Sequence, residues 1–420
     1  MIKLLILADD ITGALDTGVQ FANKGIETKV VTDIEYDFAD INKTTEVLVI
    51  DTETRPLSKQ KAYEIVHRIV KRAENAGISS IYKKTDSALR GNVGSELTAL
   101  LDASNRDSLF FIPAFPKANR ITKSGTHYLG ETPIHETSFG KDLFEPVTTS
   151  YVPDIIGLQS EANVISVSKE TDINLLKNNQ DKQIVVFDAE TEDDIKIISK
   201  LLRDNDKLHI IAGCAGFASY LPDLLSLTRN KKHLAKKTQG ICVICGSLND
   251  ITKRQVDYAV EKGFKHVNLK FKQIYTNNYF ETNQGKDCLK EIINMFKKNK
   301  ILIIDTFNRQ ETEGNEQFNY INSTNKAEVR NTIASNLGTI AKKFVENELD
   351  CTFLMTGGDT LMGFMKQVNC SFLYPICEIE QGVVLSYIYL NNTRVQIVSK
   401  SGGFGNKDVF VNIVNKLMYQ

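Results

Sequence analysis

The chain has 420 residues, a formal net charge of −1, 25% charged residues and 42% hydrophobic residues. This even balance gives neither a strongly basic surface for nucleic acid nor an acidic tail, and the length exceeds one ordinary core, so we expect two domains of roughly 200 residues. No run of about 18 apolar residues is present, and MIKLLILADD places two aspartates where a signal peptide would be apolar. We therefore expect a cytoplasmic protein that binds neither nucleic acid nor a membrane.

Short apolar runs alternate with helix-like stretches through the first half of the chain. Near-continuous apolar runs are typical of parallel strands that helices cover on both faces. The predicted strands span residues 3–8, 28–32, 46–51, 79–83, 108–114, 183–188 and 208–212. QKAYEIVHRIVKRAENAG and NVGSELTALLDA are two of the helix-like stretches between them. These alternations predict an α/β domain over residues 1–228.

A basic polar stretch, TRNKKHLAKKTQG, follows and then a second α/β series begins. We predict a linker over residues 229–239, with a phosphate-attracting arm as the alternative, since charge runs are usually solvated. The second domain is predicted over residues 240–420, with strands at 241–246, 301–307 and 352–358, helices from about Asn249 and from about Lys326 to Glu348, and a hairpin turning at Asn391 and Asn392. The predicted fold class is therefore two α/β domains with mainly parallel sheets and an active site in the cleft between them.

Seven cysteines all lie in the second half, without the spacing of a disulfide scaffold. Cys242 and Cys245 form a C-x-x-C pattern that could indicate redox or zinc chemistry. Positions three apart in a strand point to opposite faces, so the pattern favours two small buried side chains.

Charged residues follow two predicted strands of the first domain. Asp9 and Asp10 end the first strand in ADDITGALD, and KKTDSALRGNVGSE places Lys84, Asp86 and Arg90 just before a helix. A buried carboxylate is costly unless it meets a cation, a metal or a hydroxyl. Arginine matches a carboxylate with a planar fork and aspartate accepts a hydroxyl proton, so the set fits a small polyhydroxy acid. The alternative is an aspartate–arginine pair that only caps the following helix.

Three turns of small residues connect strands to helices in the second domain: CGSLNDIT, TGGDTLM and KSGGFGNKD. Glycine lets backbone N–H groups approach a ligand, and a helix N-terminus adds partial positive charge, so such turns suit phosphate. None matches the Walker A or the G-x-G-x-x-G pattern. One such turn alone is often only a tight connection. Three at successive edges of one sheet, with Lys400 beside the last, predict a nucleotide pocket.

These motifs, together with PAFPKANRITKSGTHYLGETPIHETSFGKDLFEPV and AGCAGFASYL, occur in an order that resembles the four-carbon acid sugar kinases. Members of that family phosphorylate tetronates such as threonate, erythronate or their 3-oxo forms with ATP. The resemblance covers essentially the whole chain. It implies an N-terminal acid-sugar-binding domain and a C-terminal nucleotide-binding domain, which agrees with the predicted boundary.

The resemblance also implies site residues. Those expected to contact ATP are Ser247, Gly357, Gly358, Asp359, Thr360, Gly402 and Gly403, beside Lys400. Those expected to surround the acid are Asp9, Asp10, Arg55, Lys84, Asp86 and Arg90. Three positions depart from the usual motifs: Ala88 replaces a threonine, Asp359 replaces a glutamate, and Asn119 stands where a glycine is usual. Ala88 removes a hydroxyl and leaves the identity of the acid open, whereas Asp359 keeps its charge.

The predicted reaction is transfer of a phosphoryl group from ATP to the terminal hydroxyl of the acid, with Mg²⁺ bridging the phosphates. Asp86 is the predicted base, with Asp9 and Asp10 as alternatives, and Arg90 or Arg55 is predicted to hold the carboxylate. Closure of the two domains would exclude water. The sequence leaves open which acid and hydroxyl react, the metal ligands and whether the chain forms a homo-oligomer. A non-catalytic sensor and a hydroxy-acid dehydrogenase are the other classes, although the latter should carry G-x-G-x-x-G.

Overall fold

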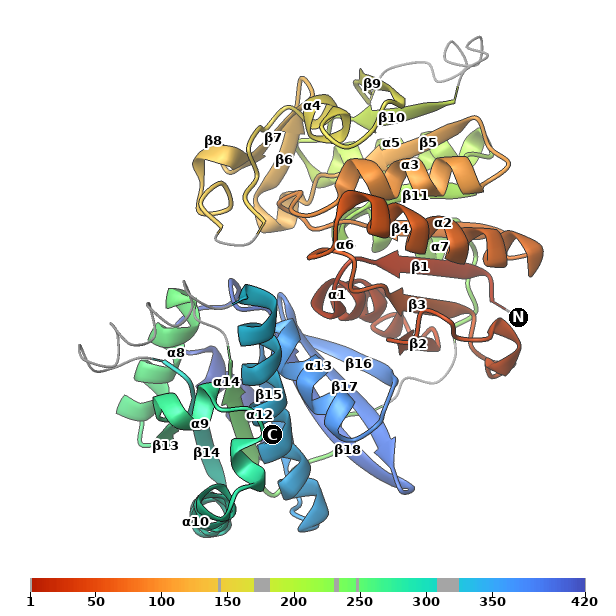
Figure 1. Cartoon of the computed structure of the whole chain (residues 1–420). Helices are drawn as coiled ribbons and strands as arrows, with labels where there is room; N and C mark the ends of the chain where they lie inside the picture. Colours follow the sequence, from red (N-terminus) through yellow and green to blue (C-terminus); the bar gives the residue numbers. More distant parts are fainter. Residues whose placement is uncertain are drawn as a thin grey trace. The chain divides into compact units, whose positions relative to one another are not determined.

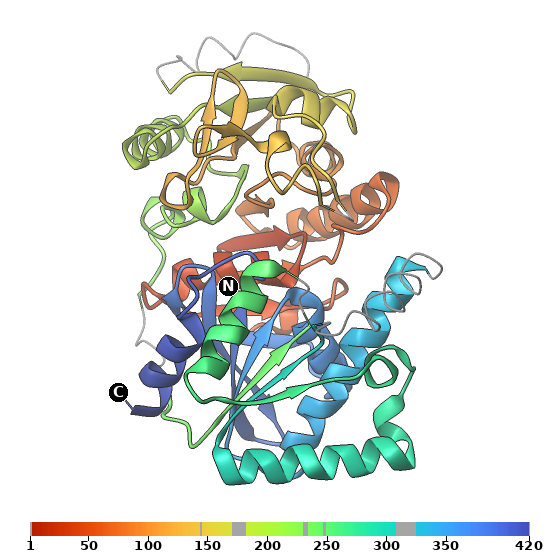
Figure 2. The same ribbon diagram turned by 90° about the vertical axis from the view of Figure 1, so that its left-hand side faces the viewer.

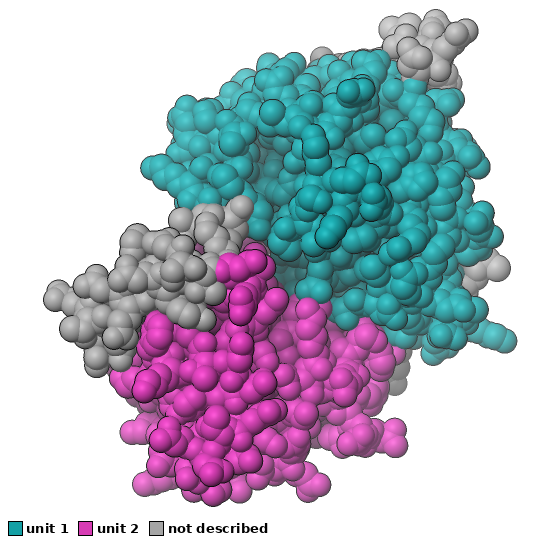
Figure 3. Space-filling view, in the orientation of Figure 1, with its two compact units in different colours: residues 1–232 teal, residues 233–420 magenta. Residues whose placement is uncertain are grey.

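The computed structural model of the chain describes residues 2–142, 145–169, 182–229, 234–246, 249–307 and 325–419. Two compact units, Met1–Lys232 and His233–Gln420, make up the chain (Figure 3). The division falls inside the predicted linker, residues 229–239. None of the helices in the described ranges has the length and apolar character needed to cross a membrane.

Unit 1 is built on a parallel sheet with the strand order β2-β3-β1-β4-β11-β5-β10-β9. The strands are β1 (Leu4–Ala8), β2 (Thr28–Val31), β3 (Val47–Asp51), β4 (Ser80–Lys84), β5 (Ser108–Ile112), β9 (Asn163–Val167), β10 (Gln183–Phe187) and β11 (Ile210–Gly213). Every residue of β1, β3, β4 and β10 is buried. The near-continuous apolar runs of the sequence therefore correspond to strands with helices on both faces.

Two helix layers cover this sheet. The helices are α1 (Ile11–Ala22), α2 (Lys59–Asn75), α3 (Val93–Ala103), α4 (Val152–Gly157), α5 (Glu192–Asp204), α6 (Ala215–Ala218) and α7 (Leu221–Leu224). α3 packs against α2 and α4, whereas α6 packs against α1 and α7, and α7 also contacts α5 (Figure 1). The chain moves along the sheet in opposite directions through α1 and α2, so right-handed crossovers place these two helices on opposite faces.

All seven strands predicted in the first half are present, and the sequence analysis missed β9 and a small antiparallel sheet. That sheet consists of β6 (Arg120–Lys123), β7 (Thr126–Leu129) and β8 (Thr132–Pro133). Its first hairpin turns at Ser124 and Gly125, whose φ angles are 49° and 74°. The strands are too short and too polar to give an apolar pattern, and only the turn residues indicate them.

Unit 2 has a parallel sheet in the order β13-β14-β12-β15-β18, which β17 and β16 extend in antiparallel fashion. The strands are β12 (Ile241–Cys245), β13 (Lys265–Asn268), β14 (Ile301–Asp305), β15 (Thr352–Thr356), β16 (Phe372–Glu380), β17 (Val383–Leu390) and β18 (Thr393–Lys400). The predicted hairpin is confirmed, with φ angles of 48° at Asn391 and 64° at Asn392. β16 was missed because Pro375 argues against a strand; it lies at a register irregularity.

Helices cover both faces of this sheet as well (Figure 2). They are α8 (Asp250–Glu261), α9 (Phe271–Tyr275), α10 (Asn283–Asn299), α12 (Lys326–Glu346), α13 (Gly358–Gln367) and α14 (Val409–Val414). α8 and α14 share a buried core with alternate residues of β12, including Val243 and Cys245. On the other face, phenylalanines of α10, α12, β15 and α13 pack in tilted and edge-on contacts with successive ring centroids 5.0, 6.1 and 5.3 Å apart.

The two cysteines of the C-x-x-C pattern are buried in the sheet. Cys242 and Cys245 form no disulfide in the structure. Cys245 belongs to the core under α8, whereas the side chain of Cys242 lies on the opposite face, near Cys351. Burial raises the pKa of Cys242 well above its ordinary value. The prediction of small buried residues is confirmed.

Candidate functional site

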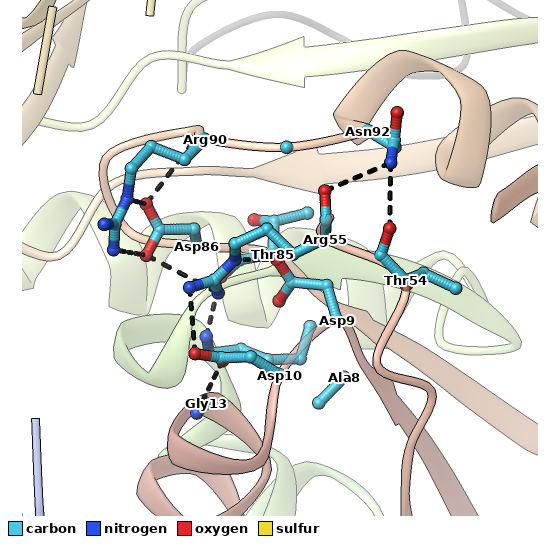
Figure 4. A network of polar contacts seen from close by, with 12 residues as sticks. Ala8, Asp9, Asp10, Gly13, Thr54, Arg55, Thr85, Asp86, Arg90 and Asn92 are labelled. Atoms are coloured by element: carbon cyan, nitrogen blue, oxygen red, sulfur yellow. Dashed lines mark hydrogen bonds and ion pairs between the residues drawn. The ribbon is translucent and has the colours of Figure 1, made fainter. Parts of the chain in front are cut away.

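The register of unit 1 brings its charged residues to one edge of the sheet. Ala8 of β1 pairs with both Asp51 of β3 and Lys84 of β4, so the loops after these three strands start side by side. Ligands of open α/β sheets bind at this carboxyl edge. All six residues predicted to surround the acid lie here: Asp9, Asp10, Arg55, Lys84, Asp86 and Arg90. Figure 4 labels all of them except Lys84.

Arg55 is the centre of this cluster. Its Nε donates to Asp9 Oδ2 at 2.7 Å and its Nη1 to Asp10 Oδ2 at 2.8 Å, while Nη2 lies 3.8 Å from Asp86 Oδ1 (Figure 4). Only 11% of the Arg55 side chain and 2% of that of Asp9 are exposed. Burial alone would raise the pKa of Asp9, but Arg55 and Lys83 lower it below its ordinary value. One buried cation therefore holds together three carboxylates from two loops, those after β1 and β4.

Asp10 also has a structural task. Asp10 is the N-cap of α1, and its Oδ1 accepts the backbone N–H of Gly13 at 2.8 Å. The Thr12 hydroxyl donates to the other oxygen of Asp10 at 2.6 Å. Both oxygens of Asp10 are thus committed within the cluster.

Asp86 and Arg90 form a bidentate pair. Arg90 Nε donates to Asp86 Oδ2 at 2.9 Å and Nη2 to Oδ1 at 3.0 Å. Burial would raise the pKa of Asp86, but the charges of Arg90 and Arg55 hold it well below its usual range. The pair does not cap α3, whose N-cap is Asn92. Arg90 Nη1 also donates to Asp142 at 3.2 Å. Asp86 is therefore ionised, and Arg90 fixes its orientation at the sheet edge.

Lys84 is a buried cation of a different kind. Its Nζ donates to the carbonyl of Thr85 at 2.7 Å, and within the described ranges no carboxylate lies at ion-pair distance from it. A Cβ at Gly13 would lie 2.8 Å from this nitrogen, so α1 approaches it closely only because residue 13 is glycine. The neighbouring Lys83, by contrast, pairs with buried Glu96 at 3.0 Å and belongs to the scaffold. Lys84 therefore keeps donors for an anion.

His127 supports this site and was not predicted from the sequence. Its Nε2 contacts the carbonyl of Ser87 at 3.0 Å and its Nδ1 the hydroxyl of Thr122 at 3.0 Å. Burial lowers the pKa of His127 to about 4, so the ring is neutral. A carbonyl only accepts, hence Nε2 carries the proton and anchors the loop that holds Asp86. His127 comes from β7 of the unpredicted small sheet, so no strand pattern pointed to it.

The residues predicted to contact ATP belong to unit 2, where the strand register again brings the turns to one sheet edge. Asp305, Cys245, Thr356 and Lys400 occupy matching positions at the ends of β14, β12, β15 and β18. The glycines that follow β12, β15 and β18 therefore leave adjacent strands at the same edge. Ser247, expected to contact ATP, lies outside the described residues.

The TGGDT turn starts α13. Gly357 is its N-cap with φ of 88°, a conformation that favours glycine, and its N–H donates to the carbonyl of Lys400 at 2.9 Å. Gly358, Asp359 and Thr360 form the first turn, whose N–H groups lack partners inside the helix and attract anions. The Thr360 hydroxyl donates to the carbonyl of Thr356 at 3.0 Å, and the carboxylate of Asp359 pairs with Arg330 at 3.0 Å.

Lys400 lies beneath the third turn. Its side chain is fully buried, and its Nζ donates to the carbonyls of Ser401 at 2.8 Å and Phe404 at 2.9 Å. Burial lowers its pKa from 10.5 to about 8. In the described part of the chain no carboxylate pairs with it. The positive charge therefore sits behind the backbone of Gly402 and Gly403.

Two family models match the chain, one within each unit. Residues 4–221 match the family model described as a sugar-binding N-terminal domain, and residues 242–410 match that of a nucleotide-binding C-terminal domain. A D-threonate kinase of Salmonella typhimurium is 32% identical over 62% of each chain, which is less than two thirds of either. A D-threonate kinase of Bordetella bronchiseptica is 25% identical over 97% of this chain and 95% of its own. The chain belongs to the four-carbon acid sugar kinase family.

Membership of the kinase family places the two groups of residues in separate modules. The six charged residues fall in the sugar-binding match, and the glycine turns with Lys400 fall in the nucleotide-binding match. A solved structure from Salmonella typhimurium LT2, provisionally described as a tRNA synthase, is 19% identical, covers 100% of both chains and has a TM-score of 0.79. At this identity the likeness supports the fold alone, and it extends over both units.

Proposed function

We propose that the chain is an ATP-dependent kinase that phosphorylates the terminal hydroxyl of a four-carbon sugar acid: threonate, erythronate or a 3-oxo-tetronate. The observation that carries the proposal is that the two matched domains hold two different kinds of site. The sugar-binding match holds a buried charged cluster, and the nucleotide-binding match holds glycine turns at one sheet edge. Curated relatives named D-threonate, D-erythronate and 3-oxo-tetronate kinases support the substrate class.

The acid is bound through cations of unit 1. Arg55 and Arg90, predicted to hold the carboxylate, are each already bonded to aspartates. Lys84 has no such partner among the described residues and its Nζ keeps free donors. The carboxylate of the acid therefore accepts hydrogen bonds from Lys84 and from Arg55 or Arg90. These bonds are charge-assisted, and a neutral sugar could not form them.

Asp86 receives the acceptor hydroxyl. Within the described contacts its Oδ2 accepts three N–H groups, whereas Oδ1 accepts only one, from Arg90 Nη2. Oδ1 therefore has room for a substrate hydroxyl. Because the pKa of Asp86 is held well below its usual range by Arg90 and Arg55 against the effect of burial, this group is ionised at neutral pH. Phosphoryl transfer needs mainly positioning and charge neutralisation, so an ionised carboxylate that orients the hydroxyl is sufficient.

The nucleotide phosphates are bound by the backbone of the glycine turns, with Lys400 supplying positive charge from behind. Mg²⁺ would be held mainly by phosphate oxygens, as is usual for this ion. Among the described residues there is no group of three or more His, Cys, Asp or Glu side chains that could hold a metal ion. Mg²⁺ supplies charge neutralisation on the phosphates when bound. Transfer also requires the acid and the nucleotide to meet away from water.

A coupled assay of ADP release with a panel of tetronates tests the proposal. The expected result is turnover that requires both ATP and a four-carbon acid and exceeds turnover with the corresponding neutral tetritols by at least about 100-fold, since a site built on charge-assisted bonds rejects analogues that leave them unmade. ATP and acid binding without turnover would favour a sensor. Turnover with a nicotinamide cofactor in place of ATP would replace the proposal with a dehydrogenase.

A further inference from the structure

The third glycine turn, residues 401–406, is held by its carbonyl groups. Thr252 Oγ1 donates to the carbonyl of Gly402 at 3.0 Å. Gln255 Nε2 faces the carbonyls of Phe404, Gly405 and Asn406 at 3.0, 2.9 and 3.1 Å. Lys400 donates to the carbonyls of Ser401 and Phe404, as described above. Side-chain donors on one side of the turn thus meet five of its carbonyls, those of residues 401, 402, 404, 405 and 406.

A carbonyl and the N–H of the following residue point in opposite directions across a trans peptide bond. Holding the carbonyls of 401, 402 and 404 on the side of Lys400 and α8 therefore turns the N–H groups of Gly402, Gly403 and Gly405 to the other side. Among the described contacts these three N–H groups have no acceptor. Successive N–H groups that face one way form an anion-binding concavity.

The outer side of the turn is also open. A Cβ built on Gly403 meets no atom within 4 Å, and the φ angle of Gly403 does not require glycine. Neither the backbone conformation nor a side chain among the described residues explains a glycine at this position. A glycine here keeps the space over the N–H groups free of a side chain, as is expected where backbone must approach a phosphate closely.

Thr252 and Gln255 are arranged for this task. They lie three residues apart in the first turns of α8, on one face, and both are fully buried. Three carbonyls can only accept, so they fix the orientation of the Gln255 amide, and its Oε1 is left buried without a described partner. Leaving Oε1 buried without a hydrogen bond costs free energy. The chain tolerates this cost, which indicates that pointing Nε2 at the turn is important.

We propose that Thr252 and Gln255 are positioning residues for the nucleotide phosphates: they hold the carbonyls of 402 and 404–406 inward so that the N–H groups of the turn face the phosphate. The inference rests on the proposed function and deepens its nucleotide site. Neither side chain touches the nucleotide. Both act through the backbone of the turn.

Isosteric variants of α8 test the positioning role. Thr252→Val and Gln255→Met remove the donors while keeping the volume, and Thr252→Ser keeps the hydroxyl. Dissociation constants for ATP, ADP and adenosine are measured by titration calorimetry without acid, and steady-state kinetics follow. The expected result is a rise in Kd and KM for ATP of about 5-fold or more for Val and Met, because each change unmakes one or more backbone bonds. Adenosine affinity and the KM for the acid should change less than 2-fold, and Thr252→Ser should restore ATP binding.

A second test does not depend on the folding of buried variants. Gly403→Ala adds a methyl group to open space and should leave the unfolding temperature unchanged while raising the Kd for ATP; Gly157→Ala in α4, also with no atom within 4 Å, is the matched control. Unchanged ATP affinity in Gly403→Ala and Thr252→Val, or equal losses for ATP and adenosine, would overturn the inference. A wild-type protein that binds no ATP would instead overturn the proposed function.

Discussion

Replacing Arg55 with methionine should destabilise unit 1 strongly. The change removes the cation that bonds Asp9 at 2.7 Å and Asp10 at 2.8 Å and leaves them, with Asp86, close together. Asp9 is 2% exposed, so water cannot replace the lost partner. Removing one member of a buried pair costs about 3–5 kcal/mol because an uncompensated charge remains. For a unit of this size we expect a fall in the unfolding temperature on the order of 10 °C.

The deficit should depend on pH in a defined direction. In the native protein Arg55 and Arg90 hold the pKa of Asp86 below its unfolded value, a stabilising effect that is complete above that value and is lost as pH falls through the folded pKa. In the variant Asp9 stays buried without Arg55, so its pKa rises and its protonation in mild acid removes its repulsion with the neighbouring carboxylates. The stability difference between wild type and variant should therefore be largest near pH 7 and shrink towards pH 4.

Thermal unfolding followed by circular dichroism at pH 7 and pH 4 measures both effects. The matched control is Arg68→Met, which removes an ion pair with Glu35 whose side chains are 52% and 58% exposed. Such a surface pair contributes at most about 1 kcal/mol. The reasoning would be refuted if Arg55→Met behaved like Arg68→Met, or if its deficit were the same at both pH values.

Three further predictions concern catalysis and nucleotide binding. Asp86→Asn should lower kcat by roughly 100-fold with little change in the Kd for ATP, since it removes the ionised acceptor; stopped-flow measurement of ADP release checks this, and near-normal kcat would transfer the role to Asp9 or Asp10. Gly357→Ala should raise the KM for ATP and cost about 1–3 kcal/mol of stability, because φ is 88° there; unchanged values in both assays would contradict it. Lys400→Met should raise the KM for ATP about 10-fold. The affinity of the wild-type protein for ATP should fall as pH rises above about 8, where Lys400 loses its proton. A wild-type Kd that does not change with pH would exclude a charged Lys400 from the site.

The sequence predicted the parts of the fold that follow from local patterns. Buried parallel strands such as LLILA and ILIID read as apolar runs, and their shared carboxyl edge explains why Asp9, Asp86 and the glycine turns could be grouped. The antiparallel strands β6 to β8 were missed because strands of two to four residues give no periodicity.

Site residues that act through tertiary contacts were beyond sequence patterns. Arg55 was expected only from the family resemblance, and its role depends on the register of β3 with β1. Thr252 and Gln255 look like ordinary polar residues of an amphipathic helix, and only their contacts with the turn around Gly402 indicate a role. The charge of Lys400 was predicted, but its burial beneath the turn depends on how the turn folds back over it.

The central claim is that phosphate is transferred from ATP to the terminal hydroxyl of a four-carbon acid. Phosphorus NMR of the product formed from ATP, Mg²⁺ and each of D-threonate, D-erythronate and a 3-oxo-tetronate tests it most directly. For at least one acid we expect a phosphomonoester signal coupled to the two protons of the terminal carbon, with one ADP formed per ester. ATP consumed to ADP and free phosphate with no ester, or no reaction with any tetronate, would contradict it.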